Sequence, residues 1–125
     1  MSLADHIVSR YIACYNDRDI DGMLACVTDD VIFENISNTG QSMRLEGRDA
    51  MAEVARLSGN AFSYRHQTVL SFLDAGDKAS AEIAFEGKAA VDLPNGVRAG
   101  EMIEIRGASF FELRDNLLCR IADYS

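Results

Sequence analysis

Apolar residues recur at every fourth position near the start of the chain, at Leu3, Ile7, Tyr11 and Tyr15. This period places them on one side of an α-helix, so the segment is predicted to form an amphipathic helix that ends near Asn16. Ser2, with Asp5 three residues later, forms a helix-start pair of the capping-box type. The chain is therefore expected to open with a helix that has one apolar side.

Two further helices are predicted in the first half of the chain. Asp19 can cap a short helix, whose apolar side would consist of Ile20, Met23, Leu24 and Val27. A third helix is expected to run from about Arg48 to Ser58, because Gly59 supplies a C-terminal stop.

Beyond the helices the apolar pattern changes to a period of two residues, which is typical of β-strands. The change is brief over residues 31–35 and then extends through the second half, where residues 79–86 and 103–113 alternate between apolar and polar. Pro94-Asn95-Gly96 marks a turn between them. Asp115-Asn116 then reverses the chain into a last strand over residues 117–124.

This order of elements predicts one α+β domain over residues 1–125. Three N-terminal helices are expected to pack against one face of a strongly curved, mainly antiparallel sheet. A sheet that curves around helices leaves a cone-shaped cavity, which is a common site for a small apolar ligand.

The composition of the 125 residues is that of an ordinary globular protein, and it mainly argues against certain classes of partner. Acidic side chains outnumber basic ones and give a formal net charge of −8. This balance repels phosphate backbones and anionic lipids, and no local basic patch is present, so no nucleic-acid or membrane partner is expected. The longest apolar runs are about five residues and the N-terminus lacks a signal-peptide layout, so a cytoplasmic location is expected.

Neither the cysteines nor the histidines form a metal or redox motif. Cys14, Cys26 and Cys119 lie in apolar stretches and are expected to be reduced core residues rather than reactive thiols. His6 and His66 lack the spacing of metal ligands. Glycine-rich nucleotide motifs and the serine-hydrolase motif are also absent, so neither a metal nor an organic cofactor is expected.

Asp123 is a polar residue at an otherwise apolar position of the last predicted strand. The alternation puts it on one face with Leu117, Cys119 and Ile121. If the strand is paired to its end, loss of solvent would raise the pKa of this carboxylate and make it a candidate general base. The alternative is a side chain that is solvated at a frayed end of the strand.

Three further polar residues fall on inner faces by the same argument. Asn35 shares a face with Phe33 and would offer a hydrogen-bond donor and acceptor, unless it belongs to a turn. Ser109 falls on the inner face of the longest strand, where its hydroxyl could instead be satisfied by the backbone. His66 has the same parity as Phe72 and would lie at the cavity mouth, unless it is a surface histidine.

Aromatic residues would supply much of the cavity wall. Tyr11 and Tyr15 lie one turn apart on the apolar stripe, where a phenol can both pack and donate a hydrogen bond. Core packing alone is the alternative for both. Phe33, Phe72 and Phe111 are expected on the inner face of the strands, either around a ligand or plugging the cavity.

The order of elements and several local strings resemble the nuclear transport factor 2-like superfamily over nearly the whole chain. The strings are Arg10-Tyr11-Ile12-Ala13, Asp19-Ile20-Asp21-Gly22-Met23, residues 29–35, Gly47-Arg48-Asp49-Ala50 and Gly107-Ala108-Ser109-Phe110-Phe111, which leads to Asp123-Tyr124. The superfamily includes ketosteroid isomerases, SnoaL-type polyketide cyclases and limonene epoxide hydrolases. The resemblance implies a conical α+β barrel that often dimerises through its sheet, but not one particular reaction.

The resemblance also implies roles for individual residues. Tyr11 falls where ketosteroid isomerases place the tyrosine that donates a hydrogen bond to the developing oxyanion, and Ser109 falls near their second donor. Their proton-shuttling aspartate falls on Asn35, whose amide cannot take a proton, so that mechanism is not expected. Cyclases and epoxide hydrolases resemble this chain in having an asparagine at the position of Asn35 and a last-strand aspartate at Asp123.

A cyclase-type role for Asp123 as the base follows from that resemblance, with Tyr11 or Asn35 as the oxyanion donor. The epoxide hydrolases also need an arginine and a second aspartate on a middle strand, where this chain has Glu86 and Lys88. We therefore expect a small, largely apolar, carbonyl-bearing ligand. The rival expectation is a non-catalytic ligand-binding or dimerisation module of the same fold.

The outer face of the predicted sheet carries scattered apolar residues among charged ones, namely Ala84, Met102, Ala108 and Phe110. Such a mixed surface is suited to packing against a second sheet, so a homodimer is expected.

Overall fold

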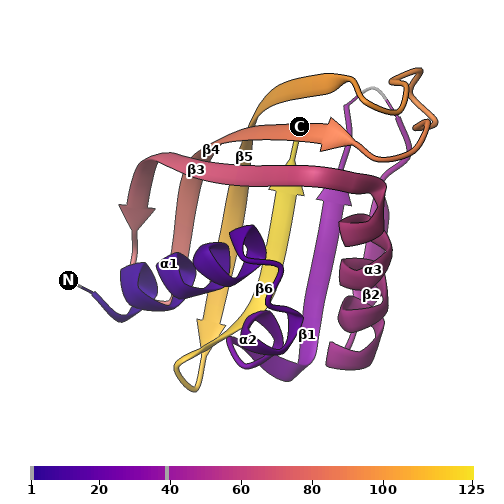
Figure 1. Cartoon of the computed structure of the whole chain (residues 1–125). Helices are drawn as coiled ribbons and strands as arrows, with labels where there is room; N and C mark the ends of the chain where they lie inside the picture. Colours follow the sequence, from indigo (N-terminus) through magenta and orange to yellow (C-terminus); the bar gives the residue numbers. More distant parts are fainter. Residues whose placement is uncertain (1, 39) are drawn as a thin grey trace.

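The computed structural model describes residues 2–38 and 40–125 and has an α+β architecture (Figure 1). Along the chain the elements are α1 (Leu3–Asn16), α2 (Ile20–Leu24), β1 (Val27–Ile36), β2 (Met43–Glu46), α3 (Arg48–Ala61), β3 (Phe62–Asp74), β4 (Lys78–Ala89), β5 (Met102–Arg114) and β6 (Leu117–Tyr124). The predicted fold class is confirmed. No helix in the described part of the chain is long and apolar enough to cross a membrane.

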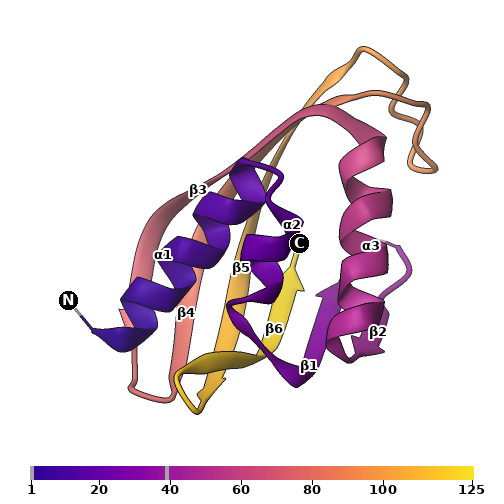
Figure 2. The same cartoon turned by 60° about the horizontal axis from the view of Figure 1, so that its bottom comes forward.

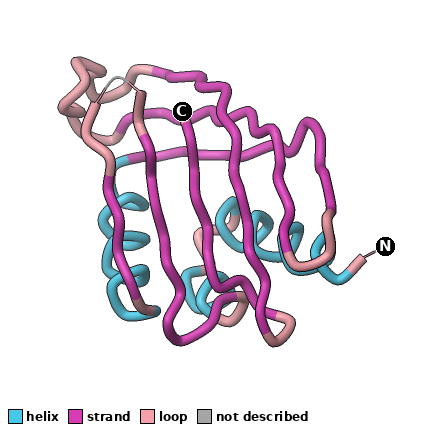
Figure 3. Tube along the Cα trace, turned by 180° about the vertical axis from the view of Figure 1, so that it is seen from behind, coloured by secondary structure: helices cyan, strands magenta, loops and turns pink. Residues whose placement is uncertain are grey.

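The six strands form one sheet in the order β2-β1-β6-β5-β4-β3. The neighbours β1 and β6 run parallel, and the other neighbouring pairs run antiparallel. The sheet curls strongly, so that β3 crosses in front of the other strands in Figure 1. All three helices lie on the concave side (Figure 2), and the view from behind shows the opposite face free of helices (Figure 3).

The beginnings of the first two helices are as predicted, because both depend on local capping. Ser2 accepts a hydrogen bond of 3.0 Å from the Asp5 backbone N–H, and α1 ends at Asn16 as expected. Asp19 accepts a bond of 2.9 Å from the Gly22 backbone N–H at the start of α2. Side-chain acceptors at these positions satisfy backbone donors that the helix itself leaves free.

Other predicted boundaries are wrong. Helix α3 begins at Arg48 as predicted but continues past Gly59, which does not adopt a left-handed conformation. The Arg18 guanidinium donates to the carbonyls of Gly59 at 2.7 Å and Phe62 at 2.5 Å, so a distant side chain supports this end of the helix. Val27 opens β1 instead of closing α2, and the short edge strand β2 was not predicted.

The core lies between the helices and the concave face of the sheet. Its most deeply buried side chains come from α1, the start of β1 and the last two strands, and include Val8, Val27, Val31, Phe111, Leu118 and Ile121. A register shift between β5 and β6 places Leu118 opposite Leu113. Leu118 therefore takes the buried position that the alternation predicted for its neighbours Leu117 and Cys119, which are half-buried.

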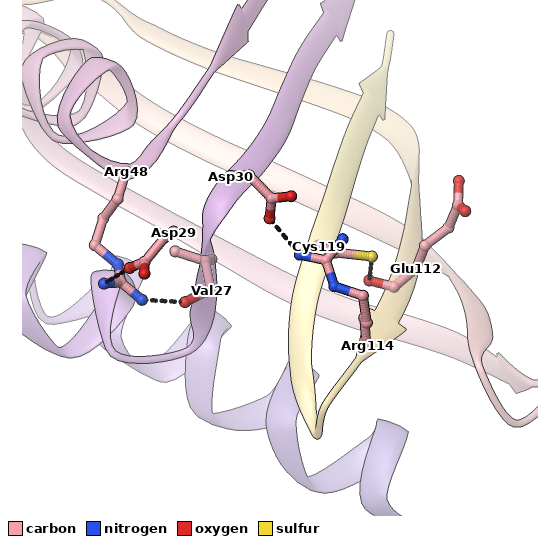
Figure 4. A network of polar contacts seen from close by, with 7 residues as sticks. All are labelled: Val27, Asp29, Asp30, Arg48, Glu112, Arg114 and Cys119. Atoms are coloured by element: carbon pink, nitrogen blue, oxygen red, sulfur yellow. Dashed lines mark hydrogen bonds and ion pairs between the residues drawn. The ribbon is translucent and has the colours of Figure 1, made fainter.

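Two arginines hold the first half of β1 in place (Figure 4). Arg48, at the start of α3, pairs with Asp29 and donates to the Val27 carbonyl at 2.6 Å. Arg114, at the end of β5, pairs with Asp30. Solvent screens exposed ion pairs, so these pairs add little stability and act mainly by fixing this irregular segment between α3 and the last hairpin.

Candidate functional site

A cavity lies between the helices and the concave face of the sheet, and we call it the inner chamber. Its volume is about 60 Å³. Its apolar wall comes from both layers and consists of Ile12, Met23, Phe33, Met51, Val54, Ala55 and Phe111. Its polar lining consists of Tyr11, Tyr15, Ser58, Arg65, Gln67, Ser109 and Asp123. The chamber thus combines an apolar wall with several convergent polar groups, as small-molecule sites do.

A wider cavity, which we call the vestibule, continues from the inner chamber. Its volume is about 250 Å³. The two cavities share six lining residues, which are Tyr15, Phe33, Ser58, Gln67, Ser109 and Asp123. The vestibule adds Asn35, Phe62, Ile83, Phe85, Ile105, Gly107, Ala108, Tyr124 and Ser125. Together the cavities approach the lower end of the roughly 300–1,000 Å³ typical of ligand sites, so a small ligand fits.

Asp123 lies where the inner chamber meets the vestibule. Its neighbours across the sheet are Asn35 on β1 and Ser109 on β5, so the three residues form a row. The Ser109 hydroxyl donates a hydrogen bond of 2.6 Å to Asp123 Oδ1. Burial raises the pKa of Asp123 to about 6, although this hydrogen bond acts in the opposite direction. A carboxyl group with this pKa can both take and return a proton near neutral pH.

Two phenols from α1 face the same space. Tyr11 is buried in the wall of the inner chamber, and burial, followed by the negative charge of Asp123, raises its pKa well above the usual value. Tyr15 lies one turn later at the junction of the two cavities, and burial also raises its pKa. Both phenols therefore stay protonated and can donate hydrogen bonds.

Asn35 and Ser109 differ in exposure although they flank the same aspartate. Ser109 is 6% exposed and lines both cavities. Its partner is the Asp123 side chain rather than the backbone. Asn35 lies within β1 rather than in a turn, is exposed, and lines only the vestibule. The amide is therefore at the open end of the row.

The phenylalanines that were expected around a ligand separate into two groups. Phe33 lines both cavities, and the deeply buried Phe111 lines the inner chamber. Phe72 packs against the hydrophobic core but lines neither cavity. The described side chains therefore leave the cavity open rather than plugging it.

The placement of His66 at the cavity mouth is wrong. A bulge between Val69 and Ser71 shifts the register of β3 against β4. His66 pairs with Glu86, whereas Phe72 pairs with Ala81, and these two positions of β4 point to opposite faces. His66 therefore lies on the outer face of the sheet, in agreement with the alternative that it is a surface histidine.

Two polar residues of β3 that line the chamber were missed. Arg65 is 4% exposed, and its guanidinium lies 4.0 Å from the centre of the Tyr15 ring. Gln67 is held by Asn16, whose side-chain amide accepts from its N–H at 2.8 Å and donates to its carbonyl at 3.0 Å. Arg65 and Gln67 lie on the same face of β3, as their spacing of two residues indicates. Only the curl of the sheet, however, brings this part of β3 onto α1.

A glycine makes room for the aromatic wall of the vestibule. A Cβ atom at Gly87 would lie 3.0 Å from ring atoms of both Phe62 and Phe85. These rings pack edge to face, with their centres 5.5 Å apart. The vestibule thus offers flat apolar surface beside the Asp123 row, which suits a planar ligand.

The site has the groups for acid–base chemistry on an apolar ligand. Within residues 2–38 and 40–125, no group of three or more histidine, cysteine, aspartate or glutamate side chains could hold a metal ion. The arrangement combines one carboxyl group that titrates near neutral pH with phenols that remain neutral donors. Such a pair can move a proton and stabilise the negative charge that results.

Comparison with known proteins agrees with the fold. The family model of the SnoaL-like domain matches residues 8–121. Among proteins with curated functions, none matches the chain. A candidate polyketide cyclase from Xanthomonas campestris pv. campestris is 25% identical, over 98% of this chain and 90% of that chain, with a TM-score of 0.76.

Two other solved structures share the fold at lower identity. An LEH-like epoxide hydrolase from Mycobacterium tuberculosis is 18% identical, over 98% of this chain and 81% of that chain, with a TM-score of 0.77. An NTF2-like protein of unknown function from Burkholderia pseudomallei K96243 is 16% identical, over 98% and 90% of the two chains, with a TM-score of 0.80. The chain therefore belongs to the SnoaL-like domain family, and it shares its fold with the NTF2-like protein.

Proposed function

We propose that the protein binds a small, largely apolar, carbonyl-bearing molecule and removes a proton from the carbon next to the carbonyl. The observation that carries this proposal is the position of Asp123, a carboxylate with a pKa of about 6 at the junction of two connected cavities. The reaction would be an intramolecular aldol cyclisation or an isomerisation. It uses only side chains of this chain.

The proposed steps begin with the Asp123 carboxylate, which takes the proton while the electrons of the C–H bond form an enolate. The Tyr11 phenol donates a hydrogen bond to the enolate oxygen. In a cyclisation, the enolate carbon then bonds to a second carbonyl carbon of the same molecule, and the new alkoxide takes the proton back from Asp123. In an isomerisation, Asp123 returns the proton to a different carbon of the same molecule.

Tyr11 is favoured over Asn35 as the oxyanion donor because of where the two side chains lie. Tyr11 is buried in the inner chamber, whereas Asn35 is exposed at the vestibule. A hydrogen bond to developing charge stabilises more strongly where water is excluded. Asn35 is better suited to contacts with the outer part of a ligand.

The similarity to the candidate polyketide cyclase supports this reaction class, and the placement of two residues of β4 argues against epoxide hydrolysis. Glu86 and Lys88, which stand where the hydrolases would need an arginine and an aspartate, both lie on the outer face of β4. The Glu86 carboxylate accepts a hydrogen bond from Tyr64 there. Neither residue lines the inner chamber or the vestibule.

The rival function is a non-catalytic module that binds a ligand or a second chain, and one experiment separates it from the enzyme. Bicyclic aromatic ketones such as 2-tetralone are tested for binding by the rise in melting temperature, since ligands of the folded state stabilise it. Exchange of the protons next to the carbonyl is then followed by NMR in D₂O. We expect both binding and exchange faster than in buffer alone. Binding without faster exchange would leave only the module, and no binding would exclude this ligand class.

A further inference from the structure

Arg65 contributes a buried positive charge to the inner chamber that the proposed proton transfer does not use. Its side chain comes from β3 and is 4% exposed. In the described part of the chain, no carboxylate lies within ion-pair distance of its guanidinium. By contrast, the less buried Arg120 binds two carboxylates, Glu34 at 3.0 Å and Glu112 at 3.1 Å. The more deeply buried cation is therefore the one without a counter-ion.

The contacts that Arg65 makes compensate its charge only in part. Its Nη1 atom donates to the Ser58 hydroxyl at 3.4 Å, which is a long hydrogen bond. The guanidinium also packs on the ring of Tyr15 at 4.0 Å. Its Nε atom is buried and has no hydrogen-bond partner among the described residues. Because buried charges are costly unless they are paired, this group is suited to receive an anion.

We propose that Arg65 binds a carboxylate group of the ligand, so that keto acids are preferred to neutral ketones as substrates. This inference rests on the proposed function and names its substrate class. Arg65 lines only the inner chamber, whereas Asp123 also borders the vestibule. The carboxylate therefore occupies the inner chamber, and the rest of the ligand extends past Asp123 into the vestibule, which Phe62 and Phe85 line.

The net charge of the chain does not oppose this arrangement. The value of −8 belongs to the whole chain, and exposed charges are largely screened beyond about 8 Å at physiological ionic strength. Arg65 is in the chamber wall, where screening is weak. A guanidinium also presents a planar fork of donors that matches a carboxylate, which the compact ammonium of lysine cannot do.

The test compares two probes that have the same shape and differ in charge, 2-naphthoate and 2-naphthamide. Both are titrated into the protein at pH 7.5 by calorimetry. We expect 2-naphthoate to bind about 10–100-fold more tightly, the range of one or two hydrogen bonds to a charged group. Equal affinities, or tighter binding of the amide, would overturn the assignment of Arg65.

Variants of Arg65 test whether this residue causes the preference for 2-naphthoate. Arg65→Met should remove the preference for 2-naphthoate, and Arg65→Lys should keep a smaller one because it retains charge but not the fork. Arg56→Met is the matched control, since Arg56 is exposed on α3, which also carries Ser58. An unchanged preference in Arg65→Lys, or in a folded Arg65→Met, would overturn the proposal. If Arg65→Met does not fold, Arg65→Lys and the comparison of the two probes still test the proposal.

Failure of the Arg65 assignment can be distinguished from failure of the proposed function. If 2-tetralone binds and exchanges its protons while 2-naphthoate gains nothing over 2-naphthamide, only the role of Arg65 is wrong. If none of the three compounds binds, the carbonyl-ligand function and the carboxylate site are both wrong.

Discussion

Ser109 and Asp123 face each other across β5 and β6, joined by a hydrogen bond of 2.6 Å, at the point where the two cavities meet. The bond favours the ionised carboxylate, whereas burial favours the neutral acid. Burial has the larger effect, because the pKa of Asp123 is raised to about 6. The pair therefore holds a base that is ionised at neutral pH yet more basic than an ordinary aspartate.

The pKa of Asp123 reflects this balance between burial and the Ser109 hydrogen bond. NMR titration of the side-chain carboxyl carbon should give a pKa of about 6 for Asp123. In Ser109→Ala the pKa should rise further, because the hydrogen bond that lowers it is gone. The rate of proton exchange should increase with pH up to the same pKa, because only the ionised form accepts a proton. A pKa near the ordinary aspartate value of about 3.9 would show that Asp123 is solvated.

The raised pKa also implies a dependence of stability on pH. The folded protein holds the Asp123 proton up to about pH 6, whereas the unfolded chain releases it near pH 3.9. Between these values the folded state binds more protons, so the contribution of Asp123 to the free energy of unfolding falls as pH rises. Asp123→Asn should therefore be more stable than the parent at pH 8, by about 2–3 kcal/mol, and similar at pH 3.5.

Urea denaturation at the two pH values measures this difference. Asp115→Asn is the matched control, since Asp115 lies in the β5–β6 turn with a φ of 54°, a conformation that asparagine tolerates well. The control should not become more stable at pH 8. Equal stability of Asp123→Asn and the parent at pH 8 would contradict the burial of this charge.

Tyr11 should act on the rate of proton removal rather than on binding. Tyr11→Phe removes the phenol but keeps the ring, so 2-tetralone should bind with affinity close to that of the parent. Exchange should slow by roughly 10²–10³-fold, the usual cost of losing one oxyanion donor. Tyr64→Phe is the control, because the Tyr64 hydroxyl bonds to Glu86 on the outer face. Exchange at the parent rate in Tyr11→Phe would assign the donor role elsewhere.

The helix-free face of the sheet should join two copies of the chain. Met102 and Phe110 are 54% and 46% exposed there, among charged residues, and such a mixed surface is suited to packing against a second sheet. We expect a dimer in sedimentation at tens of micromolar, and a monomer for Phe110→Glu. Leu57→Glu, on the exposed side of α3, should remain dimeric. A parent protein that sediments only as a monomer would count against this interface.

The sequence predicts those parts of the fold that depend on neighbouring residues. Ser2 and Asp19 start their helices because each side chain caps the backbone of the next turn. The end of α3 was not predictable in the same way. It depends on Arg18, which is far from Gly59 in sequence and meets it only in the folded chain.

Prediction of the candidate site from the sequence is limited in the same way. Asp123 could be found by alternation because β6 is regular between Ile121 and its end. His66 was misplaced because the alternation does not reveal the bulge at Val69. Arg65 was missed because a charged residue in a strand is ordinarily assigned to solvent, and only the curl of the sheet brings it to Tyr15.

The most direct test of Asp123 as the base is the rate of proton exchange in 2-tetralone with Asp123→Asn. The amide keeps the shape of the side chain and can still accept the Ser109 hydrogen bond, so fold and binding should persist. We expect exchange to fall by about 10²–10⁴-fold, the usual contribution of a positioned base. Exchange at the parent rate in a folded, ligand-binding Asp123→Asn protein would contradict the proposed mechanism.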